Sequence, residues 1–369
     1  MMVPQQLRDR MNGIARRSLA PVPLPFWERA FPKDLIALCY HMVSDEDLRH
    51  FALFPYKTSA QFEADVLFAR ERAVTYRQAA DSRLHGASLP PNSLLFTFDD
   101  GMAQCYTVIR PILQRYGVDA VFFVTTEYLD DRASFLECTI SRCLTAAAAL
   151  PLERIDAILA KLEGPAAPLP VDDERERKAM QRLPSIRIAS DDLARRRLFL
   201  WLLALEERDR ALVERACELL GLDAVDSAPH FMSHAEVRQL AADGFTIGAH
   251  GLTHRSLEGL DPLEIEHEVV ASCEAVRELT GQERVPFAFP YTGLAVERRE
   301  IGEIIRRNDV VDLVFDSGCL RRDPNYIVNR VFVDAPPATK AITNLPASLR
   351  EAWSVPSSWF RSAASAARS

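Results

Sequence analysis

The segment "LLFTFDDG" at residues 94–101 ends an apolar run with two adjacent carboxylates, Asp99 and Asp100. Neighbouring like charges repel each other and must each be hydrated or paired, so they contribute nothing as packing material. Asp-Gly after a strand also commonly forms an ordinary turn. Residues elsewhere in the chain must therefore decide between a turn and a chemical role.

A second segment, "FTIGAHGLTHRSL", places His250 and His254 directly after another apolar run. Taken by themselves, these histidines are also compatible with polar loop residues. Two imidazoles four residues apart at the C-terminal end of a strand can, however, both reach one ion. With the Asp100 carboxylate they make a three-ligand site with an open position for water, as catalytic zinc sites have. We therefore expect a divalent metal ion here, with Zn2+ as the expected species.

The elements that must position these residues show strand-helix alternation. Apolar β-like runs and helical segments alternate from residue 35, and the pattern resumes after residue 229. Such alternation predicts parallel strands joined by crossover helices, hence an α/β sheet or barrel. Two helix starts are well marked, by the capping-box spacing of Ser233 and Glu236 and by Asp261 followed by a proline.

Between residues 130 and 229 the β pattern fades and charged helical sequence replaces it. We expect an N-terminal extension over 1–34, a barrel over 35–335 interrupted by this helical insertion over 130–229, and a C-terminal tail over 336–369 that is poorly ordered at its end. Within the insertion, "GPAAPLPVDDERERKAMQRLPS" predicts an exposed linker, and the following sequence predicts one or two helices ending at Gly221. We expect the insertion to pack beside the barrel and to shape substrate access or a dimer contact.

The composition is that of an ordinary globular protein, with 48% apolar and 26% charged residues. A formal charge of -8 without a basic stripe argues against a nucleic-acid partner. The apolar runs are too short for a signal peptide or a membrane span. Seven cysteines without a Cys-x-x-Cys pair fit buried reduced thiols. We therefore expect a cytoplasmic protein.

A third segment, "FAFPYTG", places Pro290 and Tyr291 at another strand end, where a simple strand-to-turn transition is the alternative interpretation. In order, "TFDDG" at 97–101, the His-x-x-x-His pair and "FPYTG" at 289–293 resemble the motifs of the polysaccharide deacetylase family, also called the NodB homology or carbohydrate esterase family 4 domain. The segment "CYHMVSD" at 39–45 resembles the Tyr-His-x-Val opening of one branch of that family. The resemblance covers about residues 35–130 and 229–335.

The resemblance implies a distorted (β/α)7-type barrel with its site at the C-terminal ends of the strands. It implies that Asp99 is the catalytic base, that Asp100 and the two histidines bind the metal, and that the backbone N–H of Tyr291 holds the oxyanion. The implied reaction is hydrolysis of an N-acetyl group on an amino sugar or its glycan by water that the ion has acidified.

The chain departs from the family pattern in two places. Many members carry an arginine in the third motif, which orients the base, and a late Leu-x-His whose histidine is the general acid. Here Phe287 and Ala288 precede "FPY", and "YIVNRVFVDA" at 326–335 contains no histidine, as is common in the Tyr-His-x-Val branch. His41 is then the candidate acid, with a buried structural histidine as the alternative. Arg330 could replace the orienting arginine, although a solvated strand-end arginine is the interpretation we favour.

Two other functions stay open at this point. A relative could hydrolyse a different linear amide or formamide, because a metal, a base and an oxyanion hole do not define the acyl group. A degenerate barrel could instead bind a saccharide or a protein partner without turnover. An oligomer formed through the helical insertion is compatible with the sequence. A cytoplasmic location would suit a nucleotide-linked or lipid-linked precursor better than an extracellular polymer.

Overall fold

The computed structural model describes residues 22–48, 51, 53–132, 135–162, 192–205, 209–222, 229–317, 320–321, 323–337 and 342–353. The chain divides into two compact units, one formed by 1–43, 56–131 and 230–369 and the other by 44–55 and 132–229. The predicted linker at 164–185 lies outside the described residues, as do the end of the tail and the first part of the N-terminal extension.

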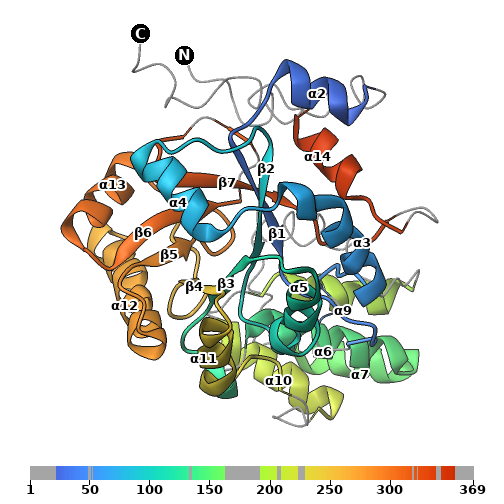
Figure 1. Cartoon of the computed structure of the whole chain (residues 1–369). Helices are drawn as coiled ribbons and strands as arrows, with labels where there is room; N and C mark the ends of the chain where they lie inside the picture. Colours follow the sequence, from blue (N-terminus) through green and yellow to red (C-terminus); the bar gives the residue numbers. More distant parts are fainter. Residues whose placement is uncertain are drawn as a thin grey trace, which may run out of the picture. The chain divides into compact units, whose positions relative to one another are not determined.

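The first unit is a closed barrel of seven parallel strands in sequence order (Figure 1). The strands are β1 (Leu35–Tyr40), β2 (Ser93–Phe98), β3 (Ala120–Val124), β4 (Thr246–Ala249), β5 (Val285–Ala288), β6 (Val311–Asp316) and β7 (Ile327–Phe332). The barrel closes where β7 pairs with β1, with Ala37 opposite Arg330 and Cys39 opposite Phe332. The predicted (β/α)7-type barrel is confirmed.

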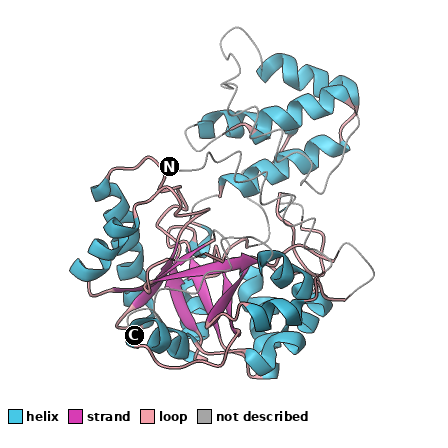
Figure 2. Cartoon of the chain, turned by 90° about the horizontal axis from the view of Figure 1, so that it is seen from above, coloured by secondary structure: helices cyan, strands magenta, loops and turns pink. Residues whose placement is uncertain are grey.

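Helices surround the strands, as Figure 2 shows with helices in cyan and strands in magenta. They are α2 (Leu24–Ala30), α3 (Ser59–Ala69), α4 (Tyr76–His85), α5 (Arg110–Tyr116), α11 (His234–Ala242), α12 (Pro262–Thr280), α13 (Arg298–Arg307) and α14 (Leu345–Trp353), with the short turns η2 (Arg70–Arg72), η3 (Cys105–Ile109) and η4 (Leu129–Asp131). The predicted capping boxes at Ser233 and Asp261 both form at the starts of α11 and α12.

Alternation along the strands decides which side chains reach the barrel interior. One buried cluster contains Ala37, Leu95, Val121, Phe123, Leu313, Phe315 and Val328. Ala37 pairs in register with Leu95 on one side and with Arg330 on the other, and two residues further on Cys39 pairs with Thr97 and Phe332. The next two-residue step reaches His41, Asp99 and Asp334. The residues that follow the strands therefore meet at one mouth of the barrel.

The C-terminal tail contains a helix that the sequence interpretation missed. Helix α14 buries Leu345, Leu349 and Trp353, which are spaced four residues apart. The Trp353 indole N–H donates a hydrogen bond of 2.9 Å to the carbonyl oxygen of Phe31, just after α2. The sequence analysis assigned no helix to the tail, because the helical spacing there extends over only a short stretch.

The second unit is helical and has a core of its own. Its helices are α6 (Leu136–Ala149), α7 (Leu152–Leu162), α9 (Leu193–Leu203) and α10 (Arg210–Leu220). Phe199 and Trp201 of α9 are buried in one cluster with side chains of α6, α7 and α10. Gly221 ends α10 at φ 72°, as predicted. The segment 44–55 groups with this unit, which the sequence did not indicate.

Within the described parts of both units, no helix combines the length and apolar character needed to cross a membrane.

Candidate active site at the mouth of the barrel

Asp100, His250 and His254 form a buried cluster where β2 and β4 end. The Nε2 atoms of His250 and His254 lie 3.3 and 3.2 Å from the same oxygen, Oδ1 of Asp100. The three residues are therefore brought together as the sequence predicted.

The position of the proton on the His250 imidazole indicates which kind of ligand this cluster can bind. Its Nδ1 lies 2.9 Å from the carbonyl oxygen of Ala288, which can only accept, so Nδ1 carries a proton. In a neutral imidazole, Nε2 then presents a lone pair toward Asp100. The Oδ1 atom of Asp100 is buried and accepts no hydrogen bond from any described residue. One carboxylate oxygen and two imidazole nitrogens are the donor set of a catalytic zinc site, and the residues fit a divalent cation.

The groups around Asp100 keep its carboxyl group ionised. Burial by itself would raise the pKa of Asp100, but the neighbouring imidazoles of His254 and His250 outweigh burial and hold the pKa well below its ordinary value. The carboxylate is thus ready to bind a cation.

The loop between the two histidines is fixed from two sides. Glu268 of α12 is buried and accepts a 3.0 Å hydrogen bond from the backbone N–H of Leu252. From the loop after β3, the Tyr128 hydroxyl donates to the carbonyl oxygen of Thr253 at 2.8 Å. His254 itself has φ 59°, a left-handed conformation that needs such support. The His-x-x-x-His spacing is therefore held on a turn rather than on a helix.

Asp99 is paired with Arg330, which overturns one sequence expectation. The guanidinium donates to both carboxylate oxygens, at 2.5 Å from Nη1 and 2.8 Å from Nη2. The two side chains are only 0% and 3% exposed, so the favoured interpretation of Arg330 as a solvated arginine is wrong. The barrel has room for it because Ala37, Cys39 and Thr97 on the neighbouring strands are small.

This ion pair sets the protonation state of Asp99. Burial raises the pKa of the carboxyl group, but Arg330 and then His250 outweigh it and lower the pKa below its ordinary value. The bidentate geometry also fixes the plane of the carboxylate. Arg330 thus orients the Asp99 carboxylate from β7.

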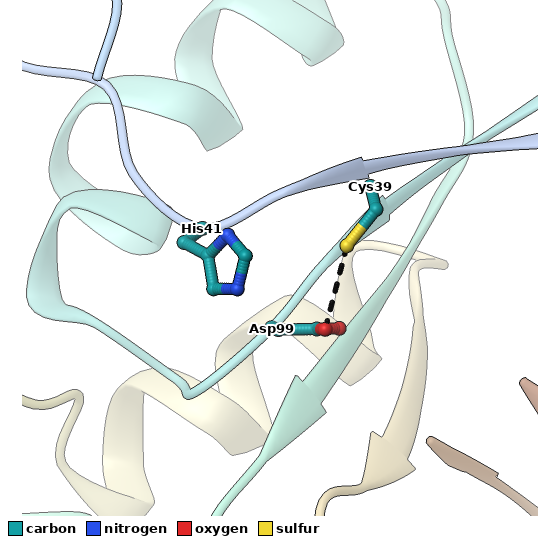
Figure 3. A group of neighbouring side chains, drawn as sticks. All are labelled: Cys39, His41 and Asp99. Atoms are coloured by element: carbon teal, nitrogen blue, oxygen red, sulfur yellow. Dashed lines mark hydrogen bonds between the residues drawn. The ribbon is translucent and has the colours of Figure 1, made fainter. Parts of the chain in front are cut away.

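Cys39 and His41 complete the surroundings of Asp99 (Figure 3). The Cys39 thiol donates to Oδ2 of Asp99 at 3.5 Å, and ligand atoms of all three residues lie within 4.8 Å of one another. This group fits a second metal ion poorly, because the charge of Asp99 is already balanced by Arg330. Burial also raises the pKa of Cys39 well above its ordinary value, which keeps the thiol protonated.

His41 is held by Asp334, a residue that the sequence analysis did not single out. The backbone N–H of His41 donates to one Asp334 oxygen at 2.8 Å, and Nδ1 lies 2.7 Å from the other. The imidazole is 22% exposed, so it is not a fully buried structural histidine. Burial lowers the pKa of His41, but Asp334 outweighs burial and raises the pKa to about 10.

The loop after β5, which carries Tyr291, reaches the group formed by Asp100, His250 and His254. We call this group the metal-ligand cluster. The Tyr291 and His254 rings lie 4.9 Å apart between centroids, at 61°, and Tyr291 has φ 58°. Asp316 at the end of β6 anchors this loop, accepting from the Gly293 N–H at 3.1 Å and from the Thr292 hydroxyl at 3.2 Å. Two arginines in turn hold Asp316, namely Arg298 and Arg321. No short motif marked this anchor in the sequence.

Residues 86–147 and 219–303 match the family model described as polysaccharide deacetylase. This part of the chain is a polysaccharide deacetylase domain. The matched segments include Asp99, the three ligands of the metal-ligand cluster and Tyr291. The other half of the deacetylase mouth, with His41, Arg330 and Asp334, lies outside them.

Three solved structures show distant likeness to the deacetylase chain. IcaB from Ammonifex degensii is 17% identical, with 88% of this chain and 97% of that one covered and a TM-score of 0.49. A de-N-acetylase from Aggregatibacter actinomycetemcomitans is 16% identical, with 84% and 98% covered and a TM-score of 0.48. The Streptococcus pyogenes deacetylase PplD is 12% identical, with 82% and 93% covered and a TM-score of 0.48. No curated protein matches the sequence.

The deacetylase domain therefore gathers the residues singled out in the sequence at one mouth. His41 and Asp99 lie together on one side, and Asp100 with the two histidines lies beside them. Tyr291 contacts the second of those histidines. Their roles as acid, base and oxyanion donor stay predictions, as does membership of the Tyr-His-x-Val branch.

Proposed function

We propose that the deacetylase domain hydrolyses the acetamide group of an N-acetylated amino sugar, with a divalent metal ion held by Asp100, His250 and His254. One observation carries the proposal: a buried donor set that fits a cation lies directly beside an ionised Asp99 that Arg330 fixes in place. This arrangement supplies a Lewis acid site and a general base side by side.

Asp99 acts as the base. When bound, the ion acidifies water and polarises the acetyl carbonyl. The low pKa of Asp99 keeps its carboxylate ionised at neutral pH, and Arg330 keeps it oriented. The backbone N–H of Tyr291 is proposed as a hydrogen-bond donor to the developing oxyanion, from a loop that Asp316 holds rigid.

His41 supplies the proton that the leaving amine needs. Its raised pKa keeps the imidazole protonated at neutral pH, and Asp334 accepts from Nδ1. Nε2 then carries the second proton, the one available to the substrate nitrogen. A cation held by Asp100, His250 and His254 would lower the pKa of His41 from about 10.

We further propose that the substrate is a nucleotide-linked or lipid-linked precursor of a glycan. This choice goes together with a cytoplasmic location, which is itself part of the proposal.

The test is an activity screen of the full chain against such precursors and chitin oligomers, after chelation and after reloading with Zn2+. We expect amine and acetate to appear in equal amounts only with metal. His254→Ala should abolish both metal binding and amine release. His234→Ala is the matched control, because His234 pairs with Asp130 and lies outside the site.

Two results would overturn the proposal. Zn2+ binding at the cluster without amine release from any acetylated sugar would favour the degenerate binding barrel. Release of formate or another acid in preference to acetate would favour the other amide hydrolases.

A further inference from the structure

Phe332 is a large apolar side chain left exposed at the mouth of the deacetylase barrel. It is the last residue of β7 and is 50% exposed. Its ring stacks on the imidazole of His41, with 5.8 Å between ring centroids and 8° between the ring planes. At this centroid distance the two parallel rings are offset, so His41 covers only part of the Phe332 ring and half of the residue stays exposed.

The position of Phe332 follows from the barrel. Val328 and Arg330 precede it on the inward-facing side of β7, and its register partner on β1 is Cys39. Phe332 is therefore in register with Cys39, and its ring reaches the imidazole of His41, two residues further along β1. Leaving an aromatic ring in water forfeits the hydrophobic stabilisation that its burial would give. A ligand that covers the open face during turnover recovers that stabilisation.

We propose that the open face of Phe332 is a stacking surface for a pyranose ring of the substrate. This inference rests on the proposed function and names the part of the substrate that binds there. The face of an aromatic ring carries negative charge density, and the C–H hydrogens on one side of a pyranose are weakly positive. Such a sugar face is flat and apolar enough to cover a phenyl ring.

The position of His41, the proposed acid, indicates that a sugar ring and not the acetyl group covers Phe332. His41 must deliver its proton to the amide nitrogen, and that nitrogen is bonded directly to a ring carbon of the sugar. A side chain packed on His41 thus lies next to the sugar. The acetyl group belongs at the metal-ligand cluster, whose His250 Nε2 lies 3.8 Å from Oδ2 of Asp99.

Phe332 also contacts His41. The test must therefore separate stacking of Phe332 on the sugar from an effect of Phe332 on the position of His41. Phe332→Leu keeps an apolar side chain without an aromatic face, and Phe332→Trp restores a larger face. Each would be assayed on chitin oligomers and on an aryl acetate that lacks a sugar, with KM and kcat determined separately. Phe26→Leu is the matched control, since Phe26 lies on α2 and is 55% exposed.

We expect Phe332→Leu to lower kcat/KM on the oligomer by roughly 3- to 30-fold, mainly through KM. The ratio of oligomer to aryl acetate activity should fall with it, Phe332→Trp should restore the ratio, and Phe26→Leu should leave it at the wild-type value. A loss of kcat on the oligomer with KM unchanged, together with a displaced alkaline limb, would show that Phe332 only positions His41, because the phenolate leaving group of the aryl acetate needs no proton from the acid. Aryl acetate cleavage by the wild-type chain without any amine release from sugars would instead refute the proposed function itself.

Discussion

The two halves of the barrel mouth are built in different ways. The metal-ligand half takes its residues from the ends of β2 and β4, in two short motifs inside the segments that match the deacetylase family. The other half, which holds the proposed acid His41 and the proposed base Asp99, depends on residue pairs formed where β7 closes the barrel. Asp99 and Arg330 are 231 residues apart, and His41 and Asp334 are 293 apart. Local spacing specifies the first half, whereas strand pairing between β1 and β7 specifies the second.

The sharpest test of this division compares the two adjacent aspartates. Asp100→Asn removes a charged ligand and should abolish stoichiometric Zn2+ binding, and activity with it. Asp99→Asn should leave Zn2+ bound while kcat falls by about 10²- to 10⁴-fold, the usual contribution of a general base. Metal analysis after dialysis, combined with turnover on an acetylated amino sugar, separates the two. Equal loss of metal in both variants would show that the halves are not distinct.

His41→Gln should keep fold and metal while lowering kcat by about a hundredfold. An acid works only when protonated, so activity falls as pH rises through its pKa. The variant should lose this alkaline limb of the pH profile. If turnover and the limb both stay at wild-type values, His41 is not the donor, and Asp99 would have to return the proton itself.

Arg330→Lys should lower kcat by about tenfold, because a lysine keeps the charge but loses the two-point contact that fixes Asp99. Arg330→Met should cost about 3–5 kcal/mol in the free energy of unfolding, since it leaves a buried carboxylate unpaired. Removing the cation also raises the pKa of Asp99, so the acid limb of the rate profile should move to higher pH. Denaturant unfolding and pH–rate profiles measure these effects, and a wild-type acid limb in both variants would contradict the pairing.

The smallest effect is expected for Asp334→Asn. The carboxylate raises the pKa of His41, so its loss lowers that pKa and should shift the alkaline limb to lower pH. Turnover should stay closer to wild type at pH 6 than at pH 8, because a larger share of His41 is protonated at the lower pH. A limb that stays in place or moves to higher pH would mean that Asp334 does not act through His41.

The sequence allowed the barrel and the metal ligands to be predicted because both depend on short-range patterns. Strand-helix alternation needs only neighbouring residues, and Asp100 and the two histidines stand in recognisable spacings. Arg330 was misassigned for the opposite reason. Its burial depends on small side chains on β1 and β2, and a strand-end arginine looks solvated until its neighbours are known.

Asp334 and Asp316 escaped the sequence analysis for related reasons. Each is a single acidic residue close to a strand end, a common arrangement without a distinctive spacing. Their partners lie elsewhere in the chain, on β1 for Asp334 and in the loops around β5 and β6 for Asp316. Helix α14 was missed although its apolar spacing was present, because the helix is only nine residues long.

The closure of β7 onto β1 also fixes the order in which the mouth can assemble during synthesis. A chain emerges from the ribosome N-terminus first, and contacts between its distant ends form late. A nascent chain exposed to about residue 310 already contains Asp100 and both histidines, while Asp99 still lacks Arg330 and His41 still lacks Asp334. The proposed hydrolysis must therefore wait for the last barrel strand, because only its synthesis brings Arg330 to Asp99 and Asp334 to His41.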